Sequence, residues 1–223
     1  VMGEDVPDDW VHVPAFKAKS APDPSDVKEA AALLAGADHP VIYAGQGIHY
    51  AKAWKELKEL AEQWNIPVTT SIEGKSAFPE DHPLSLGSGG RANSRPVKRY
   101  LEESDLILGL GVSFALTAFG VPMPPGKKII HATLDPMDLN KDVPADIGLI
   151  GDAKLTLAAL NSELSNADNS KAAARANEPE KINELKEEWM QEWLPKLTNN
   201  EAPINPYRVV AELNQLVDKE KVV

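Results

Sequence analysis

Short apolar runs alternate with segments of helical periodicity along most of the 223-residue chain. Each run is apolar along its whole length and is bounded by glycine, proline or charged residues. This pattern is typical of strands that are buried on both faces. It predicts five strands, at residues 39–45, 66–71, 105–111, 127–135 and 146–151.

Between these runs the apolar positions return every three or four residues, which indicates amphipathic helices. The segment 51–64 shows this most clearly, because Trp54, Leu57, Leu60 and Trp64 share one helical face while lysine and glutamate occupy the other. Helices are predicted at residues 25–36, 51–64, 95–104, 152–164, 182–194 and 204–217.

Buried strands that alternate with amphipathic helices predict a parallel sheet covered on both faces. Right-handed crossovers then make it a doubly wound, Rossmann-like α/β domain. We expect about five or six strands, with further helices at the C-terminal end of the chain.

The segments outside this pattern divide the chain. Residues 1–24 are rich in proline and are predicted to be a linker from a preceding domain, and residues 25–164 to be the central α/β domain. Residues 165–181 are small and polar and are predicted to be a linker outside the core. Residues 182–223 are predicted to be a helical segment that leads into a further domain. We therefore expect a piece of a longer protein.

The net charge of −11 disfavours binding to nucleic acid or to an anionic membrane, since both need a basic surface. The chain has no cysteine, which excludes disulfides and thiolate chemistry. It has neither a run of about 20 apolar residues nor the layout of a signal peptide. These features predict a cytoplasmic protein that binds neither membrane nor nucleic acid.

Candidate chemistry lies where the predicted strands end, because ligands of open parallel sheets bind outside the carboxyl ends of the strands. Turns at AGQG (44–47), Ser71, GLGVSF (109–114) and TLDP (133–136) follow four predicted strands. The dinucleotide fingerprint is not met, because Tyr50 stands where its third glycine would be. The alternative is that these glycines only form tight turns.

The loop GKSAFPEDHPLSLGSGG (74–90) is predicted to have neither helical nor strand periodicity. Asp81 and His82 within it could supply acid–base chemistry in a small hydrolase, or could form a loop hydrogen bond. The histidines have no metal-ligand spacing, and no serine lies in a nucleophile elbow. Neither a metal site nor a nucleophile is predicted.

The segments PVIYAGQG, IPVTTS, GKSAFPEDHPLSLG, SDLILGLG, KKIIHATLDP and ADIGLIGDAKLTLAAL occur in this order over residues 25–164. Together they resemble the central domain of thiamine-diphosphate-dependent enzymes of the acetolactate synthase type. The resemblance implies an enzyme, a lyase or transferase, that makes or breaks C–C bonds next to a carbonyl in substrates of the 2-keto acid type. It further implies that thiamine diphosphate and Mg²⁺ bind to the full-length enzyme through residues outside this chain, so that this chain alone is inactive.

The resemblance also implies partners. These are the adjacent pyrimidine-binding and diphosphate-binding domains of the same protein, a small-molecule substrate, and further copies in a homodimer or homotetramer. The role implied for this chain is structural, with Lys75 and Phe78 as candidates for a domain interface or a substrate channel.

Central domains of this family can hold FAD, ADP or nothing in a cleft. The matching positions here are Gly45, Gln46, Gly47, Ser71, Gly111, Ser113, Thr133, Asp135, Asp152 and Ala153. FAD-binding relatives commonly have an arginine at the position of Ser113 and many have an acid at that of Thr133, so an empty cleft is predicted. The alternative function is a regulatory module that binds an adenine nucleotide.

Overall fold

The computed structural model describes residues 11, 13, 18–90, 93–118 and 120–218, and the structural statements below concern these residues. Most of the linker predicted at residues 1–24, and the end of the C-terminal segment at residues 219–223, lie outside the described residues.

One sheet of six parallel strands forms the centre of the molecule, in the order β3-β2-β1-β4-β5-β6. The predicted doubly wound α/β fold is therefore confirmed. The strand order reverses between β1 and β4, which is where open sheets of this type form a crevice. The strands are β1 (Pro40–Ala44), β2 (Val68–Thr70), β3 (Ser85–Ser88), β4 (Leu106–Leu110), β5 (Lys128–Thr133) and β6 (Ile147–Ile150).

Strand β3 corrects the prediction for the loop 74–90, which the sequence indicated to be irregular. Its four residues, SLGS, pair with β2 at the edge of the sheet across a shift in register. Gly87 has a φ of +90°, which L-residues rarely adopt. A short edge strand of small and polar residues carries no continuous apolar run, so the sequence pattern did not reveal it.

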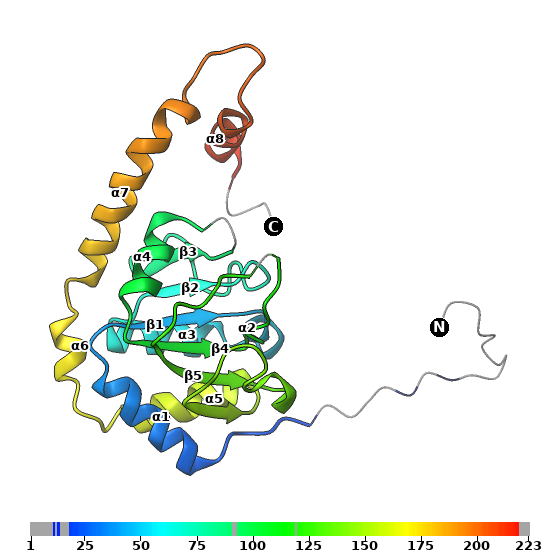
Figure 1. Ribbon diagram of the computed structural model, residues 1–223, viewed down its shortest axis with the longest axis vertical. Helices are drawn as coiled ribbons and strands as arrows, with labels where there is room; N and C mark the ends of the chain where they lie inside the picture. The colour runs from blue at the N-terminus through cyan, green and yellow to red at the C-terminus, as the bar shows by residue number, and fades with distance from the viewer. Residues whose placement is uncertain (1–10, 12, 14–17, 91–92, 119, 219–223) are drawn as a thin grey trace.

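The helices lie on both faces of the sheet (Figure 1). Helix α5 contacts both α1 and α3. The β1–β2 and β3–β4 connections run in opposite directions along the sheet, so right-handed crossovers place α3 and α4 on opposite faces. The helices are α1 (Pro24–Gly36), α2 (Gly47–Ala51), α3 (Trp54–Trp64), α4 (Arg95–Glu103), α5 (Ala153–Leu164), α6 (Ser170–Ala174), α7 (Glu178–Leu197) and α8 (Pro206–Leu216), with a 3-10 turn, η1 (Pro136–Asp138).

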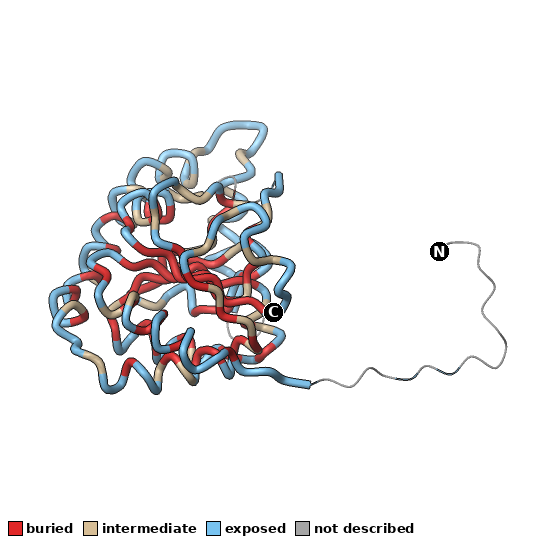
Figure 2. The backbone as a smooth tube through the Cα atoms, turned by 60° about the horizontal axis from the view of Figure 1, so that its bottom comes forward, coloured by how far each residue is buried: buried red, intermediate tan, exposed pale blue. Residues whose placement is uncertain are grey.

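The core follows the sheet and the inner faces of its helices, as the buried backbone in Figure 2 shows. Strands β1, β2 and β4 are buried along their whole length, in agreement with their continuous apolar runs. On α3 the predicted face is buried at Leu57, Leu60 and Trp64. Burial of each such side chain contributes about 1.5–3 kcal/mol.

The helix predicted at residues 51–64 begins later, at Trp54, because a separate short helix, α2, ends at Ala51. Lys52 adopts a left-handed conformation with a φ of 52°, which ends α2 and separates it from α3. Trp54, predicted on the buried face, is 43% exposed because it is the first residue of α3. Its indole Nε1 instead donates a hydrogen bond of 2.9 Å to Nδ1 of His49 in α2.

The segment 165–181 does reach the core, contrary to the prediction of a linker outside it. Helix α6 buries Ala172, and the next residues bury Arg175 and Glu178. Asn65 Nδ2 donates to the carbonyl of Ala172 at 3.0 Å. The low apolar content of the segment did not indicate this burial, because the segment is attached to the domain by hydrogen bonds of the buried polar side chains of Arg175 and Glu178.

Helix α7 passes α4 and extends beyond the sheet, where α8 packs back against it (Figure 1). Trp193 in α7 contacts Trp189 in the same helix and Tyr207 in α8, with ring centroids 6.0 and 5.1 Å away. No residue of α8 is buried. Within the described part of the chain, no helix combines the length and the apolar character needed to span a membrane.

Candidate functional site

A cleft of about 420 Å³ opens at the carboxyl ends of the strands. It is lined by the turns that follow β1, β2, β4 and β5, and so lies at the reversal of strand order between β1 and β4. This is the crevice in which doubly wound sheets bind ligands. The position of the cleft follows from topology alone.

Seven of the ten positions that the resemblance assigned to the cleft line it together. The seven are Gln46, Gly47, Ser71, Gly111, Ser113, Thr133 and Asp135. The other three, Gly45, Asp152 and Ala153, are not among the residues that line it. That any of these residues binds a cofactor remains a prediction.

The glycines of the first turn are required by packing between two turns. A Cβ on Gly45 would lie 2.4 Å from the carbonyl oxygen of Gly111, and a Cβ on Gly47 would lie 2.7 Å from the Cα of Gly111. The amide of Gly47 donates to the carbonyl of Gly111 at 3.0 Å. The close approach of these two backbones explains the glycines without a ligand, which favours the interpretation as tight turns.

The carboxylate of Asp152 binds the N-terminus of α5 and does not line the cleft. Its carboxylate accepts hydrogen bonds from the amides of Lys154 at 3.1 Å and Leu155 at 3.3 Å, and so caps the N-terminus of α5. Lys19 Nζ lies 3.5 Å from the same carboxylate. Asp152 is therefore a helix-capping residue in this structure.

The floor of the cleft contains two aromatic residues that the sequence analysis did not select. Tyr43 of β1, Gly109 of β4 and His131 of β5 are register partners in one row across the sheet. The ring of Phe114 lies over this row, 5.9 Å from the ring of Tyr43 and 4.8 Å from that of His131. A Cβ on Gly109 would lie 2.3 Å from the Phe114 ring. Only strand register brings these residues together, so no local sequence signal could identify them.

Burial shifts the pKa of two groups in this row. Burial, together with the charge of Glu73, raises the pKa of Tyr43 to about 12, although a hydrogen bond to the Val121 backbone opposes the shift. Burial also lowers the pKa of His131 below its usual value. The Nε2 of His131 donates to the carbonyl of Val112 at 2.8 Å. Its Nδ1 is buried and has no partner among the described residues. Both groups are therefore neutral near pH 7.

The charged side chains that line the cleft are the carboxylates of Glu73, Asp135 and Asp138. The carboxylate of Asp135 accepts from the amide of Met137 at 2.9 Å, and that of Asp138 accepts from the Thr133 hydroxyl at 3.2 Å. No lysine, arginine or histidine of the described residues lines the cleft. The electrostatic character of the cleft is therefore acidic.

His82 in the loop 71–84 has both ring nitrogens engaged. Its Nδ1 accepts from the amide of Leu84 at 3.1 Å, so its Nε2 donates to Glu62 of α3, also at 3.1 Å. This hydrogen bond holds the pKa of Glu62 below its usual range. No contact between Asp81 and His82 is present among those described. The geometry favours a loop hydrogen bond over the hydrolase alternative.

The two candidates for an interface or channel in this loop, Lys75 and Phe78, differ in their exposure to solvent. Phe78 is 1% exposed and belongs to the core, so the prediction that it forms an interface or channel surface is wrong. Lys75 is exposed and pairs with Glu80. His49 Nε2 donates to the backbone carbonyl of Lys75 at 2.9 Å while its Nδ1 accepts from Trp54. These two hydrogen bonds of His49 fix the backbone of Lys75 next to α2.

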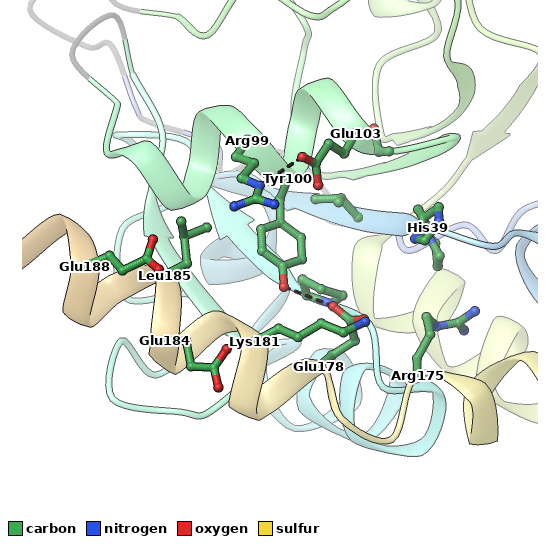
Figure 3. Close-up of a pocket in the computed structure, with 14 residues that line it drawn as sticks. His39, Arg99, Tyr100, Glu103, Arg175, Glu178, Lys181, Glu184, Leu185 and Glu188 are labelled. Carbon is green, nitrogen blue, oxygen red and sulfur yellow. Dashed lines mark hydrogen bonds and ion pairs between the residues drawn. The ribbon is translucent and has the colours of Figure 1, made fainter.

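A second cavity, of about 230 Å³, lies at the opposite edge of the sheet between β1, α4 and α7 (Figure 3). The hydroxyl of Tyr100 donates to Glu178 at 3.0 Å, and Lys181 pairs with the same carboxylate at 2.7 Å. Burial, followed by the charge of Glu178, raises the pKa of Tyr100. The charged groups around the cavity thus join α7 to α4, which indicates a structural role.

Neither cavity brings together a set of metal ligands. Among residues 18–90, 93–118 and 120–218, together with 11 and 13, no group of three or more histidine, aspartate or glutamate side chains could hold a metal ion. The described residues therefore do not fit the Mg²⁺ that the family resemblance implies for the full-length enzyme, and no catalytic step is derived through it.

The six parallel strands and the switch-point cleft define the class of the protein, a doubly wound α/β domain. Comparison with known proteins gives the family. Residues 27–160 match the family model described as "Thiamine pyrophosphate enzyme, central domain". The chain belongs to this family of thiamine-diphosphate enzyme central domains.

Curated relatives agree. The chain is 35% identical over 211 residues to the "Probable acetolactate synthase large subunit" of Methanocaldococcus jannaschii, a match that covers 94% of this chain and 34% of the relative. It is 36% identical over 152 residues to the acetolactate synthase of Mycobacterium avium, covering 67% of this chain and 24% of the relative. The chain thus spans between about a quarter and about a third of the length of these relatives.

A solved structure supports the fold. The benzoylformate decarboxylase of Polynucleobacter necessarius is similar to this chain with a TM-score of 0.58 and 25% sequence identity. The match covers 76% of this chain and 32% of that chain. The similarity to a central domain that the sequence segments indicated is confirmed.

Proposed function

We propose that this chain is the central, bracing domain of a longer thiamine-diphosphate-dependent enzyme that makes or breaks a C–C bond next to the carbonyl of a 2-keto acid. The observation that carries the proposal is the match of residues 27–160 to the family model, on relatives named as acetolactate synthases that are about three times as long. In such an enzyme the cofactor, when bound, serves as the electron sink for the reacting carbanion. We expect its ligands in other parts of the polypeptide.

The described residues support a bracing role and not a catalytic one. Among the described residues, no histidine or lysine lines the cleft to act as a base, and both ring nitrogens of His82 are engaged elsewhere. The glycines of its first turn are required by packing, and Asp152 caps a helix. What this chain supplies is a rigid sheet from which neighbouring domains can be positioned.

Helix α8 is the candidate contact with the domain that follows. It is amphipathic, yet none of its residues is buried, and Trp193 and Arg208 hold it near the end of α7. An apolar face left exposed at the end of a domain indicates that another part of the protein covers it. The exposed apolar side chains of this region are Ile204, Tyr207, Val209, Val210, Leu213, Leu216 and Val217.

The loop 71–84, between β2 and β3, is the candidate contact of this chain with the active-site region of the full-length enzyme. The hydrogen bonds from Trp54 to His49 and from His49 to the Lys75 carbonyl hold the loop backbone in one position. The side chain of Lys75 is exposed. The Lys75 ammonium pairs with Glu80 at the surface, and in this proposal it exchanges that partner for the carboxylate of the substrate. A homodimer or homotetramer and a cytoplasmic location remain part of this proposal.

The experiment uses the full-length protein that carries this segment, with thiamine diphosphate and Mg²⁺ added. Pyruvate is the first substrate, and both CO₂ release and the formation of a carboligation product are measured. We expect turnover that requires the cofactor, and none from the 223-residue chain alone. Turnover by this chain alone, or full-length protein that converts no 2-keto acid in a cofactor-dependent way, would contradict the proposal.

A further inference from the structure

The cleft at the carboxyl edge of the sheet has the wrong charge for the adenine nucleotide that the resemblance allows. FAD and ADP both carry a diphosphate, which proteins bind with arginine, lysine or backbone N–H groups at a helix N-terminus. Each of these three means of binding can be examined in the described residues.

Cationic side chains are the first of these. The charged residues of the lining are three carboxylates, on Glu73, Asp135 and Asp138, and no lysine, arginine or histidine among the described residues joins them. Asp135 follows β5 and Glu73 follows β2, so the carboxylates flank the crevice from strands on both sides of β1 and β4. These carboxylates repel a negatively charged diphosphate in the cleft, and salt screens only part of this repulsion.

Backbone N–H groups are the second. The amides of Gly45, Gly47 and Gly111, which would form an anion-binding turn, donate instead to the carbonyls of Leu110, Gly111 and Ala132, at 2.9, 3.0 and 2.8 Å respectively. The first two hydrogen bonds join the turn after β1 to the end of β4, and the third joins Gly111 to β5. The glycine turns therefore offer no free donor from these three positions.

A helix N-terminus is the third. The short helix α2 begins in the cleft lining, at Gly47. The amide of Ile48 donates to the carbonyl of Gly45 at 3.1 Å, and those of His49 and Tyr50 donate to the carbonyl of Gln46 at 3.0 and 3.2 Å. These amides are therefore already engaged and are not available to a phosphate.

We infer that this cleft excludes nucleotide diphosphates, and that any ligand it does take is uncharged or positively charged. The aromatic floor formed by Tyr43 and Phe114 and the hydroxyls of Ser71 and Thr133 suit an uncharged ring with polar substituents. This inference concerns the cleft alone. The test of the proposed enzyme activity contains no nucleotide, so the outcome of that test and the outcome of this one are independent of each other.

The test compares adenosine with ADP on the intact full-length protein, saturated with thiamine diphosphate and Mg²⁺. The two ligands share the base and ribose and differ in the diphosphate. Isothermal titration is expected to show ADP binding no more tightly than adenosine, and the purified protein is expected to lack the absorbance of flavin near 450 nm. ADP binding about tenfold tighter than adenosine, or co-purified FAD, would overturn the inference.

A double variant tests whether charge is the cause. Ser113→Arg places a cation at the mouth of the cleft, and Asp135→Asn removes an anion while keeping an oxygen to accept from Met137. We expect this variant to bind ADP at least about tenfold more tightly than the wild type, without a comparable gain for adenosine. Ser113→Gln controls for side-chain size, and Asp81→Asn, which lies outside the cleft, makes the same change of charge as Asp135→Asn alone.

Circular dichroism establishes that each variant is folded. A folded double variant that gains no more ADP affinity than Ser113→Gln would show that charge does not decide what the cleft binds, and the inference would then be wrong. An equal gain in Asp81→Asn would have the same consequence, because that residue lies in a different cavity.

Discussion

The guanidinium of Arg175 donates a hydrogen bond of 2.9 Å to the backbone carbonyl of Trp64, the last residue of α3. A second hydrogen bond of 2.9 Å goes to the carbonyl of Ala37, which caps the C-terminus of α1. Arg175 is 4% exposed, and burial lowers its pKa. One cation thus compensates the negative ends of two helix dipoles and ties the segment after α5 to the domain.

Arg175→Met is expected to lower the free energy of unfolding of the chain by about 2–4 kcal/mol, because two buried carbonyls lose a charged donor. Urea denaturation measures the difference. The matched control is Arg99→Gln, which breaks an exposed pair with Glu103 and should cost less than about 0.5 kcal/mol. Equal effects of the two changes would show that Arg175 contributes only as a surface charge.

Gly45→Ala is expected to destabilise the chain by about 3 kcal/mol or more, since the new Cβ would lie 2.4 Å from a backbone oxygen that cannot move freely. Gly36→Ala is the control, because no atom lies within 4 Å of its added Cβ and its φ is not positive. It should be neutral or stabilise by up to about 1 kcal/mol. Thermal unfolding of the two variants decides whether Gly45 is a packing requirement.

His131 is expected to make stability depend on pH near neutrality. Its pKa is lowered by burial, so the unfolded chain takes up this proton more readily than the folded chain. The contribution is therefore complete above the ordinary pKa of about 6.5 and is lost as pH falls, by up to about 1.4 kcal/mol per pH unit.

The measurement is urea unfolding at several pH values between about 7.5 and 5.5, the window set by the ordinary histidine pKa. His131→Gln should lose less stability over this window than the wild type, and the exposed His39→Gln should lose about as much as the wild type. A slope that disappears in His39→Gln and persists in His131→Gln would contradict the assignment.

Val210→Glu tests the contact proposed for α8. Val210 is 65% exposed in the middle of α8, so the substitution should change the stability of this chain by less than about 0.5 kcal/mol. In the full-length protein we expect a loss of about 2 kcal/mol or more, if the following domain covers this face. Asn214→Glu, an exposed polar position on the same helix, is the control. Equal behaviour of the two variants in the full-length protein would remove α8 as an interface.

The strands and most helices could be predicted because their signal is local. The runs PVIYA and LILGL are buried at every position, as a continuous apolar run implies for a strand covered on both faces. The cap of the first helix is local too, as Asp23 accepts from the amide of Ser25 at 2.8 Å. Such features depend on residues a few positions apart, which the sequence displays directly.

The candidate site was predictable in position and not in detail. The rule for open sheets placed Gln46, Ser71 and Ser113 at one crevice before the structure was known. It could not show that Gly45 packs against the turn at Gly111 or that Asp152 lies outside the lining of the cleft. Those placements depend on distances between turns that follow different strands.

The amino-acid sequence by itself determined the alternation of strands and helices, the family resemblance and the acidic net charge, because each is a property of composition or of short-range order. Only the tertiary structure decided that SLGS forms an edge strand, that Phe114 packs on Tyr43, and that Arg175 is buried. The physical reason is that these residues gain their roles from partners that are distant in the sequence, which strand register and helix packing bring close together.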